Sequence, residues 1–407
     1  MTLGAANYAV TLVEDNLGLP AGELTGVQMP RELVESLEST QKGKTPGNAD
    51  EPFIEKMILA FSEQQEKESL ETRGFSVRKA RWPSGAPFGV CLTHDVDNIS
   101  MPFSHVVSVR KRFRRSDLLL AMLGLKSLYN NVAFIADEER ARGVRSSFYF
   151  LTTNYSLRGL ASLLATLEKE GWEVGLHGDF GTHDSADGLE TALRLFEDQT
   201  GITPRGVREH FLRFDFDRTW EIMDRAGLEY DSSVGFRDRL GFPLGLCTPF
   251  HPPNREWKPM KLLELPLVLM DTTLWGYLKR DEEEGASDVN STVAKVERVN
   301  GLFTLLWHQE AVRMKGGRLY NSILDELKRK NAFIGSGREV ARWWNARSIP
   351  LKREGREFRL HGAPKGLMLR AKTRGGRGLD VRGGKVTTAN DELLVSVESQ
   401  EFRMTVE

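Results

Sequence analysis

Between residues 146 and 345 the sequence alternates short apolar runs with longer amphipathic segments, and this alternation limits the possible folds more than any other feature. The short runs predict strands and the longer segments predict helices. The predicted strands are 146–151, 173–177, 206–210, 262–267, 302–308 and 332–335, and the predicted helices are 157–169, 189–199, 218–226, 288–299, 323–330 and one around Trp343. Strands joined through helices form a parallel sheet. With an earlier strand at 90–92, about seven or eight such units predict an α/β fold, a closed or nearly closed (β/α) barrel.

The sequence changes character on both sides of this region. Residues 1–84 carry no chemical motif and predict an N-terminal extension of amphipathic helices. Beyond Pro350, short apolar runs separated by glycine-rich turns predict antiparallel strands, enough for a small β-sandwich-like domain. We therefore expect three parts: the helical extension at 1–84, the barrel at 85–347 and the β-rich domain at 348–407.

The composition excludes several classes of protein. The chain has 407 residues, 40% hydrophobic and 28% charged, and its net charge of −1 gives no basis for nucleic-acid binding. No apolar stretch reaches the roughly 18 residues that a membrane span needs. Residues 1–7 lack the basic and then apolar order of a signal peptide. Because Cys91 and Cys247 are too few for a disulfide framework, we expect a cytoplasmic protein.

One segment suggests contact with a membrane surface. Residues 108–125 join a basic sequence, Ser108-Val-Arg-Lys-Arg-Phe-Arg-Arg, to an apolar one, Leu118-Leu-Leu-Ala-Met-Leu-Gly-Leu. Such a segment can rest on an anionic membrane as a peripheral contact, or hold a substrate that carries phosphate. The simpler interpretation is a helix with a solvated basic face, and the sequence leaves both open.

Ionisable residues gather where the predicted strands end. They are Asp95, Asp97, His177, Arg208, His210 and His308. In a (β/α) barrel the carboxyl ends of the strands meet at one rim, and catalytic groups lie there. We therefore expect these residues to converge, although they are far apart in the sequence.

The chemistry of these residues suits metal-assisted hydrolysis. Asp97, His177 and a second histidine would form a carboxylate–imidazole site for a divalent metal, and the imidazoles favour Zn²⁺. Such a metal polarises a carbonyl group and lowers the pKa of water, while Asp95 is free to serve as a general base. Arg208 can hold a carboxylate through its guanidinium group, and His308 can protonate a leaving group.

The order of these motifs resembles that of the polysaccharide deacetylases of the NodB-homology type. The matching segments are Thr93-His-Asp-Val-Asp, Leu176-His-Gly, Arg208-Glu-His-Phe, Leu263-Glu-Leu-Pro and Leu306-Trp-His. The resemblance implies a distorted (β/α) barrel and metal-dependent hydrolysis of an N-acetyl, sometimes an O-acetyl, group on a carbohydrate. The roles that it implies are the general base for Asp95, metal ligands for Asp97 and His177, orientation of the base for Arg208 and the catalytic acid for His308.

Two departures from the family's pattern concern the metal site. Val96 separates the two aspartates, which are adjacent in most of the family, as in a branch that keeps Asp-Val-Asp. The family's second motif repeats its histidine four residues on, where this chain has Gly181. The third ligand is therefore His183 or His210, with Asp179 as a weaker option. The strand-end position favours His210.

Three further residues are candidates for binding the substrate. Arg213, in the segment that follows Arg208, would meet an anionic group of the substrate. Trp307 stands near the rim, where an apolar pocket would hold the acetyl methyl group. Glu264 matches the family's fourth motif, which shapes the pocket wall. The carrier of the sugar, whether a lipid, a nucleotide or a polymer, stays open.

Two other functions compete with deacetylation. A barrel that has lost hydrolysis would be a carbohydrate-binding protein. Against this, a protein that only binds has no use for an opposed acid and base such as His308 and Asp95. The same metal site would also serve an amidase that hydrolyses a non-sugar C–N bond.

Overall fold

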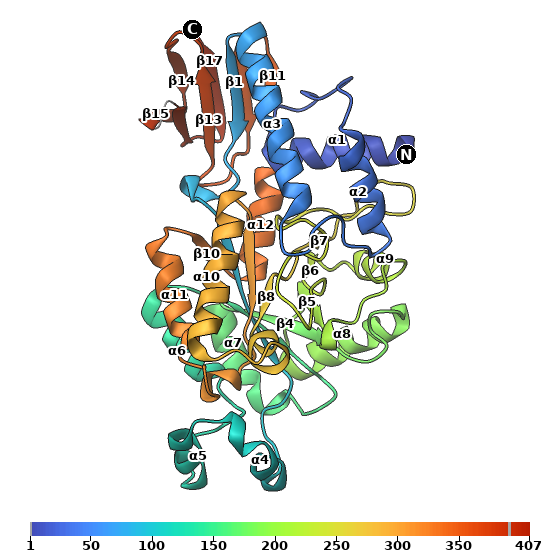
Figure 1. The fold of residues 1–407 in the computed structure, drawn as a ribbon, viewed down its shortest axis with the longest axis vertical. Helices are drawn as coiled ribbons and strands as arrows, with labels where there is room; N and C mark the ends of the chain where they lie inside the picture. Colours follow the sequence, from blue (N-terminus) through green and yellow to red (C-terminus); the bar gives the residue numbers. More distant parts are fainter. Residues whose placement is uncertain (1, 390–391) are drawn as a thin grey trace.

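The computed structural model describes residues 2–389 and 392–407, and its centre is a sheet of nine strands (Figure 1). The strands are β2 (Gly89–Val96), β3 (Ser147–Phe150), β4 (Glu173–Gly178), β5 (Gly206–Glu209), β6 (Tyr230–Asp231), β7 (Leu263–Glu264), β8 (Leu269–Met270), β9 (Leu302–Leu306) and β10 (Phe333–Gly335). Their order is β7-β6-β5-β4-β3-β2-β9-β8, with β10 beside β2, and all the pairs are parallel.

β2 lies in the middle of this sheet and is buried along its whole length. Its first half pairs with β9, from Gly89 opposite Leu302, and its second half pairs with β3, from Thr93 opposite Ser147. A parallel strand that is covered on both faces needs a continuous apolar sequence, which the run Val90–Leu92 supplies. The polar residues begin only where the strand approaches the rim of the barrel.

The strands β7 and β8 stand at the two ends of the strand order and do not pair with each other. The chain runs directly from one to the other. The linking residues 265–268 are hydrogen-bonded to both sides of the gap. The backbone N–H of Leu267 donates to the carbonyl of Val234 at 2.9 Å, and that of Val268 donates to Thr304 at 3.2 Å. The predicted distorted (β/α) barrel is therefore confirmed. The sequence does not predict β6 and β8, because each strand has two residues and cannot show a periodic pattern of apolar side chains.

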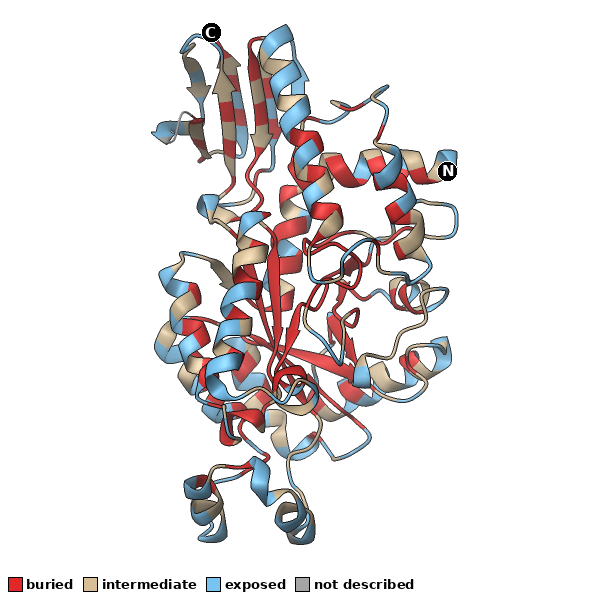
Figure 2. Ribbon diagram, in the orientation of Figure 1, coloured by how far each residue is buried: buried red, intermediate tan, exposed pale blue. Residues whose placement is uncertain are grey.

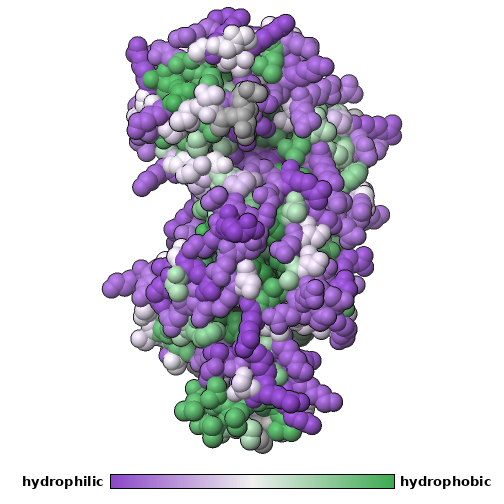
Figure 3. Space-filling view, turned by 60° about the vertical axis from the view of Figure 1, so that its left-hand side comes forward, coloured by the Kyte–Doolittle hydropathy of each residue, from purple (hydrophilic) through white to green (hydrophobic). Residues whose placement is uncertain are grey.

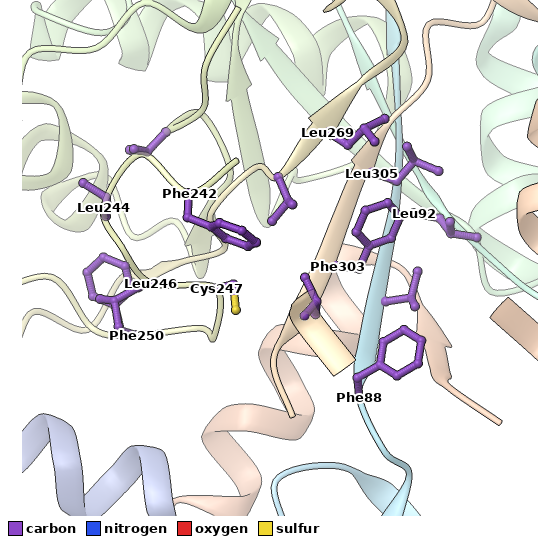
Figure 4. Packing of buried hydrophobic residues seen from close by; sticks show 14 of the residues in the cluster. Phe88, Leu92, Phe242, Leu244, Leu246, Cys247, Phe250, Leu269, Phe303 and Leu305 are labelled. Atoms are coloured by element: carbon purple, nitrogen blue, oxygen red, sulfur yellow. The ribbon is translucent and has the colours of Figure 1, made fainter. Parts of the chain in front are cut away.

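Helices pack around the sheet and leave its strands buried (Figure 2). These helices are α6 (Val132–Arg142), α7 (Ala161–Lys169), α8 (Ala186–Thr200), α9 (Thr219–Arg225), α10 (Glu282–Arg298), α11 (Leu319–Arg329) and α12 (Gly337–Arg347). Figure 4 shows part of the core, where Leu92 of β2 lies near Phe303 and Leu305 of β9. Of this set, only α6 has no counterpart among the predicted helices.

Three helices near the N-terminus share this core: α1 (Leu3–Leu17), α2 (Arg31–Gln41) and α3 (Phe53–Thr72). The buried carboxylate of Glu55 on α3 accepts hydrogen bonds from Asn16 of α1 and from the backbone N–H of Thr248. These bonds join two of the helices to the loop of the barrel that contains Thr248.

The C-terminal strands form two antiparallel four-stranded sheets, ordered β1-β13-β16-β15 and β11-β12-β17-β14. The strands are β1 (Phe75–Lys79), β11 (Lys352–Glu354), β12 (Glu357–His361), β13 (Met368–Thr373), β14 (Leu379–Arg382), β15 (Gly384–Ala389), β16 (Glu392–Val397) and β17 (Glu401–Val406). Alternate residues such as Phe358, Leu369 and Met404 are buried between the sheets. β1 lies within the part predicted to be helical, because its partner β13 is distant in sequence and local patterns do not reveal such a pairing. The division at residues 84 and 347 stays a prediction.

Two short helices, α4 (Phe103–Val109) and α5 (Arg115–Met122), project from the barrel at the end of the molecule opposite the C-terminal sheets (Figure 1). Within the described part of the chain, no helix combines the length and the apolar character that crossing a bilayer requires.

Tyr230 of β6 fills the space next to Gly206, which predicts a large effect for a small substitution. A Cβ atom on Gly206 would lie 2.0 Å from Cζ of Tyr230. The tyrosine is held in place, because its hydroxyl is hydrogen-bonded to Tyr149 at 2.7 Å and donates to Glu173 at 2.8 Å. We expect Gly206→Ala to lower the free energy of unfolding by about 1–3 kcal/mol, measured by urea denaturation. In the control Gly159→Ala the new methyl group has no neighbour within 4 Å, and equal midpoints for the two variants would contradict the prediction.

Candidate active site

The residues predicted at the strand ends meet at one edge of the sheet. Asp95 lies near the end of β2, and Asp97 follows the strand directly. His177 on β4 is in register with Arg208 on β5, and His210 comes immediately after β5. Because the strands are parallel, their carboxyl ends share this edge.

Asp97, His177 and His210 form the one group among the described residues that has the geometry of a metal site. Each offers one ligand atom, and these atoms all lie within 4.8 Å of one another. Nε2 of His177 is 3.2 Å from Oδ1 of Asp97, and Nε2 of His210 is 3.8 Å from Oδ2 of Asp97. One carboxylate and two imidazoles are a donor set that suits a divalent metal with open positions.

The hydrogen bonds of His177 prepare it to bind a metal. Its Nδ1 lies 2.7 Å from the backbone carbonyl of Arg208. A carbonyl only accepts, so Nδ1 carries the proton and Nε2 of the neutral ring presents a lone pair. That lone pair faces Oδ1 of Asp97, an arrangement that needs a proton or a cation between the two atoms. Burial opposes a charge on His177, but Asp95 and Asp97 raise the pKa of His177.

The electrostatics of the other two ligands agree with this arrangement. Burial raises the pKa of Asp97, but the neighbouring histidines outweigh it and hold the pKa well below its ordinary value. Burial and the nearby His177 lower the pKa of His210, so its imidazole is kept in the neutral form that binds metals. The residues present therefore fit a divalent cation.

An unusual turn follows His210 directly. The next two residues, Phe211 and Leu212, have φ values of 60° and 50°, in the left-handed region that residues other than glycine rarely occupy. The ring of Phe211 stacks on the His210 ring at 3.9 Å between centroids. Backbone strain of this kind concentrates at functional sites, where surrounding contacts hold it in place.

His183 and Asp179, the other candidates for the third ligand, do not belong to the cluster. Nε2 of His183 lies 3.8 Å from Asp184, and its backbone carbonyl accepts a hydrogen bond from Thr219. Oδ1 of Asp179 is 3.9 Å from Nδ1 of His210, on the ring atom that faces away from Asp97. The geometry thus favours His210.

Asp95 lies beside the cluster and faces Arg208. Its carboxylate is 3.7 Å from Nε2 of His177 and 3.9 Å from Nη1 of Arg208. Both residues are buried, and the guanidinium group is held by Ser232 at 2.9 Å and Thr93 at 3.3 Å. Oδ1 of Asp95 has no hydrogen-bond partner, which leaves it able to accept a proton.

His308 follows β9 and is paired with Asp271, a residue that the sequence analysis missed. Nδ1 of His308 lies 2.6 Å from Oδ1 of Asp271, and its backbone N–H is 3.3 Å from the same oxygen. Burial opposes the charge on His308, but Asp271 raises the pKa of His308 well above its usual value. Asp271 follows β8, so the rule of polar residues at strand ends would have identified it if β8 had been recognised.

Two of the predicted substrate-binding residues lie in the core instead. Glu264 is fully buried on β7, where it accepts a hydrogen bond from Trp220 at 2.8 Å and shares a hydrogen bond with Asp231. Burial and Asp231 raise the pKa of Glu264 well above its usual value, so the carboxyl pair holds a proton between its members. This pair lies in the interior and does not form a pocket wall.

Trp307 is also fully buried, against Trp275 and Tyr320. Trp307 is therefore part of the hydrophobic core. Arg213 does lie at the surface of the site, with its guanidinium group 3.7 Å from the ring centre of Phe180.

Comparisons with known proteins give matches among solved structures only. No family model matches the chain, and no curated protein matches it either. Among solved structures, one from Mycobacterium smegmatis described as a polysaccharide deacetylase is 16% identical with a TM-score of 0.49, and the match covers 67% of this chain and 95% of that one. Another so described, from Pseudomonas aeruginosa, is 16% identical with a TM-score of 0.47, covering 66% and 94%. The Puue allantoinase is 15% identical with a TM-score of 0.48, covering 66% and 93%.

The chain resembles the polysaccharide deacetylases, as the order of its motifs predicts. Because one fold can host unrelated functions, the chemistry of this chain depends on the residues of its site.

Proposed function

We propose that this protein is a metal-dependent hydrolase that removes an acetyl group, in the first place an N-acetyl group, from a carbohydrate. The observation that carries the proposal is the placement of a carboxylate and a carboxylate-paired imidazole at the same edge of the sheet as the ligand cluster. Asp95 lies 3.7 Å from Nε2 of His177, and His308, which follows β9, is paired with Asp271 at 2.6 Å. Hydrolysis of an amide needs both a base for the water and an acid for the leaving nitrogen.

Asp97, His177 and His210 would hold the metal. A divalent cation at this position would act as a Lewis acid on the substrate's carbonyl group and make water easier to deprotonate. The identity of the metal follows from the imidazole donors, which favour Zn²⁺ over Mg²⁺ or Ca²⁺.

The other polar residues of the site have separate tasks. Asp95 takes a proton from the attacking water, and Arg208, with Nη1 3.9 Å from Oδ1 of Asp95, orients the carboxylate. Asp271 holds Nδ1–H of His308, so the remaining proton on Nε2 is the one that passes to the leaving nitrogen. Because Asp271 never touches the substrate in this scheme, it is a positioning residue.

A groove beside the site would receive the sugar. It has a volume of about 610 Å³ and its lining includes Leu212, Ser233, Phe236, Arg237 and Tyr277. Leu212 also packs against the cluster of Leu267, Met270 and Leu306, next to Asp271, so the groove adjoins the catalytic groups. Aromatic and hydroxyl-bearing residues suit the faces and hydroxyl groups of a saccharide.

We place this activity in the cytoplasm. Cys91 and Cys247 are both buried and unpaired, as expected in a reducing compartment. A substrate there would be a precursor of a surface polysaccharide, linked to a lipid or a nucleotide.

Metal content tests the proposal directly. We expect about one divalent ion per chain in the purified protein, measured by elemental analysis after Zn²⁺ is supplied. The ion should be lost in Asp97→Ala, His177→Ala and His210→Ala, because each removes one ligand of the cluster. Acetate release from N-acetylated oligosaccharides should be lost with it.

His183→Ala is the matched control, since it removes a nearby histidine that lies outside the cluster. It should retain both the metal and the activity. A wild-type protein that takes up no metal would exclude metal-dependent hydrolysis, and the carbohydrate-binding alternative would then lead. Metal uptake with hydrolysis only of non-sugar amides would favour the amidase.

A further inference from the structure

The helices α4 and α5, together with the residues between and after them to 126, form an arm that projects from the barrel at the lower end of Figure 1. The arm begins a few residues after β2, whose carboxyl end carries Asp95 and leads to Asp97. It therefore rises from the same edge of the sheet as the candidate active site.

The base of the arm is attached to the loop that follows His308. Phe113 forms a β-bridge with Met314, and the backbone N–H of Lys315 donates to the carbonyl of Arg112 at 2.9 Å. Nη2 of Arg114 donates to the carbonyl of Val312 at 2.8 Å. These bonds fix the direction of the arm relative to the catalytic groups.

A small hydrophobic core connects the arm to the residues that follow it, and this core uses only one side of α5. Phe113, Leu128 and Tyr129 are buried there, with Leu118 and Ala121 of α5 packed against them. Leu118 and Ala121 are three residues apart, so they lie on one face of the helix.

A second apolar face of the arm has no partner. Leu119, Met122 and Leu123 are 59%, 73% and 62% exposed, and Leu125 is 69% exposed. The first three are spaced as neighbours on one helix face. Figure 3 shows hydrophobic side chains gathered at the lower end of the molecule, where the arm lies. Large apolar residues that cluster in this way mark an interaction surface, unlike scattered ones.

The exposed charges of the arm are positive. Asp117 is the only acidic residue of the arm, and it is already paired with Arg114 and Lys126. Four other basic residues are exposed and form no ion pair with any residue that the structure describes; they are Arg110, Lys111, Arg112 and Arg115. A symmetric contact with a second copy would bring these charges together, which disfavours self-association.

We propose that the arm docks the protein on an anionic lipid surface. Leu119, Met122 and Leu123 would enter the headgroup region, and the four unpaired basic residues would contact the lipid phosphates. This inference needs no assumption about catalysis. In combination with the proposed function, it makes a lipid-linked carbohydrate the substrate class, because the arm and the catalytic groups face the same way.

The test is sedimentation of the full chain with vesicles. We expect binding to vesicles of equal parts phosphatidylcholine and phosphatidylglycerol, little binding to phosphatidylcholine alone, and weaker binding at high salt. The triple variant Leu119→Gln/Met122→Gln/Leu123→Gln should bind about 100-fold more weakly, since it removes the apolar contribution. In a second variant, Arg110, Lys111, Arg112 and Arg115 are changed to Gln. We expect its binding to anionic vesicles to weaken by a similar factor, because it removes the electrostatic contribution alone.

Leu195→Gln and Lys365→Gln are the matched controls, because both residues are exposed but lie outside the arm. Both controls should bind vesicles like the wild type. Acetate release from a water-soluble substrate should be unchanged in both arm variants, which separates this inference from the proposed function. The proposal is overturned if the wild type ignores anionic vesicles at low salt, or if both arm variants bind as it does. It is also overturned if light scattering shows a dimer that the triple variant breaks.

Discussion

Replacing Asp95 with asparagine is expected to lower kcat by about 100- to 10,000-fold, the usual contribution of a general base. The substitution keeps the size of the side chain and removes only its ability to take a proton. Asp95 lies beside the ligand cluster but is not part of it, since the three ligand atoms come from other residues. The variant should therefore still bind its metal.

Two measurements on Asp95→Asn separate chemistry from assembly. Elemental analysis should give the wild-type metal content, while acetate release falls. Asp184→Asn is the control, because Asp184 is close in space to His183 but outside the cluster, and its activity should match the wild type. If Asp95→Asn kept most of its activity, another group would have to be the base.

Removing the imidazole of His308 is expected to lower kcat by about the same factor as Asp95→Asn. His308→Gln eliminates the group that would protonate the leaving nitrogen, so kcat should fall by about 100- to 10,000-fold. The loss should be smallest for substrates whose leaving group needs no proton, such as acetate esters of acidic phenols. A comparison of the variant on an amide and on such an ester measures this directly.

Asp271→Asn should change the pH dependence as well as the rate. Asp271 raises the pKa of His308 well above its usual value, so the protonated form persists to high pH and activity falls only as the pH rises through that raised pKa. Without the negative charge the pKa of His308 drops, and the basic limb of the kcat profile should move to lower pH. Asp288→Asn, which removes a carboxylate paired with Arg280 on α10, is the control and should leave the profile unmoved. An unshifted limb in Asp271→Asn would show that His308 is not the titrating group.

Much of the barrel could be predicted from sequence because a parallel sheet leaves a strong local signal. The strands at the centre of the sheet are covered on both faces, so β2, β4 and β9 each contain a short, mostly apolar run. Their carboxyl ends share one edge by topology alone, which is why Asp95, His177 and His308 could be expected at one site. Short strands such as β8 carry no such signal, and Asp271 was missed with it.

The structure adds to the prediction that His210, rather than His183, is the proposed third ligand. The sequence favours His210 by its strand-end position, and the geometry places its Nε2 3.8 Å from Oδ2 of Asp97. The left-handed turn at Phe211 and Leu212, which stacks Phe211 on the His210 ring, is a conformation that local propensity would not predict for these residues.

The surroundings of several other residues were also decided by long-range packing. The sequence alone determined the alternation of the longer strands and helices and most of the chemical types present at the strand ends, since both follow from local patterns and chain direction. It did not determine that Glu264 and Trp307 are interior, or that β1 joins the C-terminal sheets. It also left open which face of α5 is unpartnered. These outcomes depend on contacts between segments far apart in the chain. The free energies of such contacts cannot be inferred from a local sequence pattern.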